Sequence, residues 1–296
     1  MNLNLYTLTA IDGILVGHVT MAQEKTGCTV VLCPPHTICG ISQNGGGSGT
    51  RETDGLRAGS LVECVDAIAF SGGSVFGLSV ADGVLRYLHE HERGMRTAGG
   101  LVPIVPTAII YDLLVGESNF PDAKSGYEAC LNASALPVKS GSIGAGAGAT
   151  TGKYAGIKKS RAAGIGNAGT QVSADIKMAV MLVVNSFGDV VEPTKDLSHA
   201  EKSIIINPTS MNNQRENTIL GIVATNAGLT KDELTIIARM AQSGLARSIY
   251  PSHTPFDGDT IFAISTGSKP YDVFSLGTLA QRLTQEAIYD AINSVR

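Results

Sequence analysis

Thr218 is the residue around which this sequence can do chemistry. It comes after the polar run 207–215 and the pair Glu216-Asn217, and it opens an apolar, β-branched stretch, so we expect it at the border between a loop and a buried strand. At such a border its hydroxyl can take over the acyl group of Asn217, and hydrolysis of the resulting ester frees a chain that begins with Thr218. The freed residue carries a nucleophilic hydroxyl and an α-amine with a pKa of about 7.7–8.0 that can act as its base.

Two carboxylates lie where they can assist that amine. Asp257 and Asp259 immediately precede the run 260–264, and residues two apart in an extended segment point to one face. A nearby carboxylate raises the pKa of an ammonium group whereas burial lowers it, so the pair can set how much free amine is present near neutral pH. The same residues also fit an Asp-Gly turn beside an ordinary loop-to-strand border, without any chemistry.

Three further side chains could stabilise the oxyanion of an acyl-transfer reaction. Asn185 ends the apolar run 177–185, where it either caps the strand or turns inward and offers an amide N–H. Lys153 ends the glycine-rich segment 141–153 and can present a cation to a developing negative charge. Tyr111 closes another apolar run, either as a rim tyrosine with a wet hydroxyl or as a hydrogen-bond donor into a cleft.

The chain has 35 glycines, and two glycine-rich segments raise the alternative of a nucleotide-binding enzyme. In segment 141–153, the positions that a P-loop requires to be Gly and Ser or Thr are Ala147 and Tyr154, so that motif fails. Residues 144–149 match the looser dinucleotide pattern, but no strand-turn-helix pattern surrounds them, and we favour close backbone packing. The other segment, 44–54, fits either a flexible hairpin tip or a loop that faces a ligand.

The composition favours a globular protein of one large or two ordinary domains, since 43% of its 296 residues are hydrophobic. The net charge is −4 and the Lys and Arg residues are scattered, so we expect neither nucleic acid nor a membrane as partner. The start lacks the features of a signal peptide, which predicts a cytoplasmic location. Five cysteines without a C-x-x-C pair predict reduced thiols rather than a disulfide frame or a metal site.

Periodicity and turn residues predict alternating strands and helices. Strands are expected within 13–33 and at 67–70, 177–185, 218–223 and 260–264, and helices at 75–91, 230–247 and 274–295. A capping box, Thr230 with Glu233, opens the second helix. The two prolines of segment 101–112 favour an edge or a bend over a central strand. The polar residues 188–217 fit an exposed linker in which the chain can be cut.

Several segments taken together resemble one known family. They are residues 49–54, 103–112, 144–153, the Asn217–Thr218 junction and residues 253–259. In this order they are similar to the DmpA-type self-cleaving aminopeptidases, which include the L-aminopeptidase/D-esterases and the β-peptidyl aminopeptidases. They resemble in particular the endo-type 6-aminohexanoate (nylon) oligomer hydrolases. The acidic pair falls 39 and 41 residues after Thr218, as 257 − 218 and 259 − 218 give, which is the spacing in the nylon hydrolases.

The resemblance implies an α/β fold, a four-layer αββα sandwich similar to the N-terminal-nucleophile hydrolases and of the DmpA/ornithine acetyltransferase type. It implies a single domain, 1–296, that cuts itself into an α chain (1–217) and a β chain (218–296). Thr218 is then the nucleophile for the cut and for turnover of small amides or short peptides, through an acyl-Thr218 intermediate and without a cofactor or metal. Family members resemble tetramers of αβ units, so a homo-oligomer is expected.

The resemblance also assigns a role to each candidate residue. The acidic pair holds and polarises the amine and hydroxyl of the nucleophile. The residues that line the site and stabilise the tetrahedral oxyanion are Asn185, Lys153 and Tyr111. In the β-peptidyl branch both the nucleophile and the first acidic position are serines, so Thr218 and Asp257 indicate the nylon-hydrolase-like branch and leave strict aminopeptidase specificity open. The alternative function is that of an uncleaved, inactive homologue that persists as a binding or structural protein.

Overall fold

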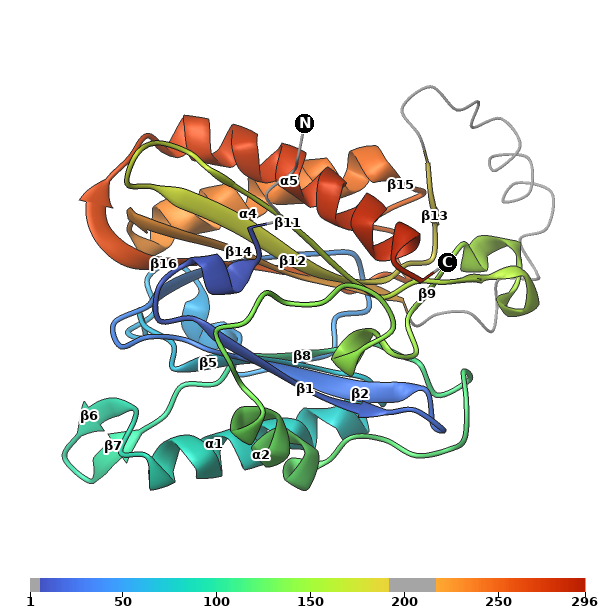
Figure 1. The fold of residues 1–296 in the computed structure, drawn as a ribbon, viewed down its shortest axis with the longest axis horizontal. Coiled ribbons are helices and arrows are strands. Elements are labelled where there is room, and N and C mark those ends of the chain that lie inside the picture. Colours follow the sequence, from blue (N-terminus) through green and yellow to red (C-terminus); the bar gives the residue numbers. More distant parts are fainter. Residues whose placement is uncertain (1–5, 192–216, 296) are drawn as a thin grey trace.

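Two five-stranded β-sheets stacked face to face form the centre of the computed structural model, which describes residues 6–191 and 217–295 (Figure 1). The first sheet has the strand order β1 (Leu15–Met21), β2 (Thr26–Leu32), β5 (Ala67–Ser71), β8 (Thr107–Ile109) and β4 (Thr50–Arg51). The second has the order β11 (Ile165–Gln171), β12 (Lys177–Asn185), β14 (Thr218–Gly228), β16 (Asp259–Pro270) and β3 (Ile38–Asn44). The other described strands form pairs: β6 (Met95–Thr97) with β7 (Gly100–Val102), β9 (Thr150–Thr151) with β10 (Arg161–Ala162), and β13 (Asp189–Val190) with β15 (Ile249–Tyr250).

Helices cover the outer face of each sheet and so make four layers (Figure 1). The helices on the first sheet are α1 (Val80–Glu90) and α2 (Ala123–Leu131), and those on the second are α4 (Lys231–Ser248) and α5 (Val273–Asn293). One hydrophobic core lies between the sheets, where the rings of Phe70 and Phe262 have centroids 6.1 Å apart, and one core lies under each helix pair. The predicted αββα sandwich is confirmed.

β14 lies in the middle of the second sheet, antiparallel to β12 and parallel to β16. Its side chains alternate between two cores. Leu220 and Ile222 enter the core between the sheets, whereas Ile219 and Val223 enter the core under α4 and α5. By the same alternation Thr218, the first residue of the strand, faces the space between the sheets. The strand starts where the sequence predicts it, and its start directs a hydroxyl inward.

The helix predictions hold best where capping residues mark an end. α4 begins after a capping box in which Thr230 and Glu233 each bind the other's backbone N–H, as predicted. The first predicted helix, 75–91, is wrong at residues 75–79, which belong to the 3₁₀-helix Ser74–Ser79 before α1 begins. Gly73 precedes that short helix with a φ of +79°, so a left-handed turn sets the start of the segment.

Two expectations about extended segments are wrong. Within segment 101–112, β8 pairs with β5 on one side and β4 on the other rather than at an edge, because both prolines precede the strand and leave its N–H groups available for pairing. In segment 188–217, the prediction of an exposed linker is wrong for Asp189–Val190, which is half-buried and pairs with β15. Its residues 192–216 lie outside the described part of the chain.

The cysteines behave as predicted. All five are free, and all but Cys64 are buried. Burial raises the pKa of Cys28, Cys33 and Cys130 to about 12, which keeps these thiols protonated. Among the helices that the structure describes, none is long and apolar enough to cross a membrane.

Candidate active site

The Thr218 hydroxyl lies next to the peptide bond that the sequence marks for cleavage. Its Oγ1 donates a hydrogen bond of 2.6 Å to the carbonyl oxygen of Asn217. Both residues are buried, with 3% of Thr218 and 1% of Asn217 exposed. The nucleophile and the carbonyl group that it would attack are therefore held together away from bulk water.

Thr218 also lines a cavity of about 130 Å³. The wall of this cavity consists of Gly47, Gly49, Ser74, Val75, Leu78, Ile109, Tyr111 and Thr218. A cavity of about 150 Å³ holds a benzene molecule, so there is room here for a small acyl group of about six heavy atoms. Thr218 starts a strand of the second sheet and Tyr111 follows β8 of the first, so the cavity lies where the two sheets meet. Of the two interpretations of Tyr111, this position favours a cleft residue.

The glycine loop after β3 reaches the cavity because it packs directly on the acidic segment. Gly47 N–H donates to the carbonyl oxygen of Asp257 at 2.9 Å, and a Cβ on Gly45 would lie 2.1 Å from the same oxygen. Only glycine allows so close an approach of two backbones. Since Gly47 and Gly49 then line the cavity, the structure favours a ligand-facing loop over a flexible hairpin tip for residues 44–54.

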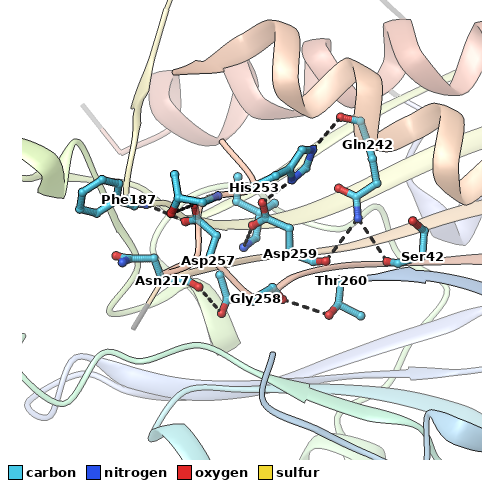
Figure 2. Close-up of polar contacts among 12 residues, drawn as sticks. Ser42, Phe187, Asn217, Gln242, His253, Asp257, Gly258, Asp259 and Thr260 are labelled. Atoms are coloured by element: carbon cyan, nitrogen blue, oxygen red, sulfur yellow. Dashed lines mark hydrogen bonds and ion pairs between the residues drawn. The ribbon is translucent and has the colours of Figure 1, made fainter. Parts of the chain in front are cut away.

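Asp257 and its neighbours hold the cleavage point from the adjacent strand (Figure 2). Asn217 forms an isolated parallel bridge with Asp257, in which its N–H donates to Phe256 O at 3.0 Å and its carbonyl oxygen accepts from Gly258 N–H at 2.7 Å. The Asp257 carboxylate accepts from the backbone N–H and the hydroxyl of Thr254, at 2.9 and 2.6 Å. Burial raises the pKa of Asp257, and the charge of the second acid of the pair raises it further.

Asp259 orients the peptide group that follows the nucleophile. Its Oδ1 accepts from Ile219 N–H at 2.9 Å. Its Oδ2 pairs with His253 Nδ1 at 2.8 Å (Figure 2). Along β16 the residues of the same parity, Ile261 and Ala263, enter the core under the helices, so the Asp259 side chain points to that side of the sheet. In the uncut chain Asp259 therefore acts on Thr218 through the backbone.

His253 is a site residue to which the sequence analysis gave no role, although it begins the segment 253–259. It has a φ of +55°, a left-handed backbone conformation that is uncommon for a residue other than glycine. Burial opposes protonation, but the hydrogen bond to Asp259 and the charge of Asp259 outweigh it, so the pKa of His253 is raised. The sequence offers only the proximity of a histidine to an acid six residues later, which does not predict that the two meet.

Lys153, Asn185 and Tyr111 form a hydrogen-bonded line beside the nucleophile. Lys153 Nζ donates to the side-chain and backbone oxygens of Asn185 at 2.7 and 3.1 Å, and Asn185 Nδ2 donates to the carbonyl oxygen of Tyr111 at 3.1 Å. Asn185 is also the register partner of Thr218 across β12 and β14, so both side chains face the space between the sheets. The structure thus brings together the three residues that the sequence offers as oxyanion stabilisers.

Lys153 holds its proton weakly. Burial lowers the pKa of Lys153 to about 7, although the carboxylates of Asp257 and Asp112 partly oppose this effect. Near neutral pH the side chain therefore exchanges between an ammonium ion and a neutral amine. A residue in that state can present positive charge to an oxyanion or transfer a proton.

Asp112 is a second residue that the sequence analysis left without a role. It follows Tyr111, is 3% exposed, and accepts hydrogen bonds of 2.7 Å from Gly73 N–H and from the Thr26 hydroxyl. Burial raises the pKa of Asp112. Gly73 begins the turn that carries the cavity residues 74–78. Through its hydrogen bond to Gly73, Asp112 therefore fixes one wall of the cavity to the segment that contains Tyr111.

The glycines of segment 141–153 pack on backbone and side chains, as predicted. A Cβ on Gly144 would lie 2.4 Å from Thr29 Oγ1, and one on Gly148 would lie 2.0 Å from Lys25 O. The segment forms a 3₁₀ turn and the short strand β9 rather than the strand-turn-helix of a dinucleotide site. Within the described chain, no group of three or more His, Cys, Asp or Glu side chains could hold a metal ion.

A model of peptidase family S58 matches residues 7–295. The chain belongs to peptidase family S58. The uncharacterized aminopeptidase Rv1333 of Mycobacterium tuberculosis is 38% identical over 289 residues, which cover 88% of this S58 chain and 82% of that protein. The 6-aminohexanoate-oligomer endohydrolase of Kocuria sp. is 26% identical over 312 residues, which cover 94% of this chain and 84% of that protein.

The S58 fold is also found in solved structures. The L-aminopeptidase D-Ala-esterase/amidase from Ochrobactrum anthropi, a variant of the Ntn-hydrolase fold, superposes with a TM-score of 0.76 at 19% identity, covering 98% of this chain and 86% of that one. The resemblance to the DmpA-type family is thereby confirmed. As an S58 peptidase whose relatives include aminopeptidases and amide hydrolases, the protein is a hydrolase of peptide or amide bonds.

Proposed function

We propose that this S58 peptidase is a self-processing amidohydrolase that cleaves its own Asn217–Thr218 bond and then uses Thr218 as an N-terminal nucleophile. One observation carries the proposal: the Thr218 hydroxyl lies 2.6 Å from the carbonyl oxygen of Asn217, and the same residue lines a cavity of about 130 Å³. One oxygen is therefore placed for both reactions.

Self-cleavage proceeds by an acyl shift followed by hydrolysis. Thr218 Oγ1 bonds to the carbonyl carbon of Asn217, the bond from that carbon to the Thr218 nitrogen breaks, and the hydroxyl proton passes to the leaving nitrogen. Water then hydrolyses the ester, which leaves a carboxylate on Asn217 and a free α-amine and hydroxyl on Thr218.

The two products, the α chain 1–217 and the β chain 218–296, would stay together as one domain. β14 and β16 come from the β chain, and they lie between β12 and β3 of the α chain in a single sheet. The cut falls just before β14, so every backbone pair of that strand, from Thr218 with Asn185 onward, is retained.

Turnover uses the groups that surround the freed threonine. The α-amine of Thr218 accepts the hydroxyl proton as the substrate carbonyl is attacked, and Asp257 sets the proton affinity of that amine. The donors for the oxyanion are Asn185, Lys153 and Tyr111, which are joined by hydrogen bonds beside β14. Water then hydrolyses acyl-Thr218, and no cofactor takes part.

Small amides and short peptides are the proposed substrates. The cavity has room for about six heavy atoms, judged against the cavity of about 150 Å³ that holds benzene. Relatives named as aminopeptidases and as an amide-oligomer endohydrolase support the same chemical class.

Intact mass measurement of the purified chain tests the self-cleavage. Fragments of about 22 and 8 kDa, scaled from 30.7 kDa by residue number, are expected for the wild type under denaturing conditions. Thr218→Ala is expected to stay at full length. Thr225→Ala, which removes a hydroxyl from the same strand far from the cut, is the matched control and should cleave normally. An uncut wild-type chain would instead support an inactive homologue that serves as a binding or structural protein.

A substrate panel tests the second reaction. Amino acid p-nitroanilides, small esters and 6-aminohexanoate oligomers present the same carbonyl chemistry with different acyl groups. We expect the cleaved wild type to hydrolyse at least one class and Thr218→Ala to hydrolyse none above background. Turnover by uncut Thr218→Ala would contradict the assignment of the nucleophile.

A further inference from the structure

Two hydrogen-bond donors meet at the carbonyl oxygen of Asn217. The Thr218 hydroxyl donates at 2.6 Å. Gly258 N–H donates at 2.7 Å (Figure 2). During self-cleavage the hydroxyl loses its proton while its oxygen bonds to the carbonyl carbon, so it stops donating to the carbonyl oxygen. The N–H of Gly258 keeps its place while that oxygen gains negative charge.

We infer that the backbone N–H of Gly258 is the oxyanion donor of the self-cleavage step, an inference that rests on Thr218 acting as the nucleophile. In this step the C–Oγ bond forms as the π electrons of the carbonyl group move onto the oxygen of Asn217. Gly258 N–H stabilises that oxyanion. The electrons then return as the C–N bond to Thr218 breaks and the nitrogen takes up the proton.

The donor is already at the distance that this role requires. Oxyanion donors lie about 2.7–3.1 Å from the charged oxygen, and the bond from Gly258 N measures 2.7 Å. Asn217 and Asp257 are 1% and 2% exposed, so little water competes for the oxyanion. A hydrogen bond to a developing charge is stronger in such surroundings than in water.

The position of Gly258 is fixed on several sides. The bond from Asn217 N–H to Phe256 O, 3.0 Å long, closes the bridge, and the Thr260 hydroxyl donates to Gly258 O at 3.1 Å. A Cβ on Gly258 would lie 2.5 Å from Gly47 O, so the glycine is also required for the loop to pack. The donor therefore needs no rearrangement when the charge forms.

The neighbouring acid is compatible with this role. A fully charged carboxylate on Asp257 would repel an oxyanion at the adjacent residue. Its oxygens instead face Thr254 and Phe187 N–H, and burial followed by the charge of Asp259 raises its pKa. The raised pKa reduces the negative charge on Asp257, and the donors on Thr254 and Phe187 offset part of the charge that remains.

Replacement of one backbone N–H by an ester oxygen tests the inference without adding a side chain. A Gly258→glycolic acid chain of full length, made by cell-free translation with an α-hydroxy acid, removes the donor and adds no side chain. The ester also weakens the Asp257 carbonyl oxygen as the acceptor of Gly47 N–H, an effect that the thermal unfolding below measures. Gly141→glycolic acid is the matched control, because Gly141 N–H donates at 2.8 Å within another isolated bridge, to Ile165, far along the chain from the cleavage point. Mass spectrometry measures cleavage at Thr218 over time, and thermal unfolding compares the two chains.

We expect the ester at Gly258 to slow cleavage by about 10²–10³-fold, the effect of losing one oxyanion donor. The ester at Gly141 should change the cleavage rate less than about threefold. It should lower the melting temperature by about as much as the ester at Gly258 does, since each ester removes one backbone hydrogen bond. Cleavage of the Gly258 ester at the wild-type rate, or an equal slowing of both chains, would overturn the inference alone. If the wild-type chain stays uncut, the proposed function fails as well, so the two failures are distinguishable.

Discussion

Lys153→Met is a sharp test of the site because it separates stability from function. Lys153 is 8% exposed, and burial lowers its pKa to about 7. Between pH 7 and its ordinary pKa of 10.5, the unfolded chain binds a proton that the folded chain releases. The lysine therefore destabilises the fold most at pH 7 and below, and this effect fades as the pH rises. We expect Lys153→Met to stabilise the fold at pH 7 while it lowers turnover.

The magnitude follows from the two pKa values. Where Lys153 is protonated in both the folded and the unfolded chain, the drop in its pKa from 10.5 to about 7 lowers the free energy of unfolding by about 5 kcal/mol. Removing the ammonium group also breaks its hydrogen bonds to Asn185, at about 1–2 kcal/mol each. The net expectation at pH 7 is a gain of about 1–3 kcal/mol. From pH 7 to pH 9 this gain should shrink by about 2–3 kcal/mol, since the parent gains about 1.4 kcal/mol per pH unit.

Urea unfolding at pH 7 and pH 9 measures both quantities. All chains carry Thr218→Ala, so that they stay uncut and match the structure described here. Lys124→Met is the control, because it removes the same charge from a side chain that is 82% exposed. If the stability difference between Lys153→Met and its parent is the same at both pH values, the low proton affinity of the buried lysine is refuted.

Two further predictions concern the other acid–base groups. The pKa of His253 is raised, so its contribution to stability is fully present below pH 6.5 and is lost as the pH rises through the raised value. His253→Ala should therefore lose more unfolding free energy at pH 5.5 than at pH 8.5 in urea titrations, and equal losses would contradict the pairing with Asp259. Asp259→Asn turns one of two acceptor oxygens into a donor that faces Ile219 N–H or His253. Self-cleavage should slow by at least about tenfold on denaturing gels, because a buried charged pair loses one partner; an unchanged rate would show that Ile219 needs no such anchor.

The sequence predicts those features of the site that depend on local patterns. The change from polar to β-branched residues at Thr218 marks the start of β14, and the capping box at Thr230 marks the start of α4. The spacing of Asp257 and Asp259 predicts their side chains near one strand end. Each of these patterns involves only a few residues that are close together in the sequence, so the sequence alone is enough to recognise it.

The missed features depend on contacts between distant segments. Gly258 contributes through its backbone N–H, which every residue except proline possesses, so no residue type announces it. Asp112 acts through Gly73, which is 39 residues away. The prolines of segment 101–112 favour an edge or a bend, yet β8 lies between neighbours from residues 50–51 and 67–71. Local propensity does not determine which strands become neighbours.

The position of the cut explains why one site can serve both proposed reactions. Cleavage before Thr218 would leave the pairing of β14 with β12 and β16 in place, because those pairs begin at Thr218 and Leu220. The new amine would stay in place, because Asn185 flanks Thr218 on one side and Asp259 holds Ile219 N–H on the other. Asp259 thus anchors the strand through a peptide group that survives the cut.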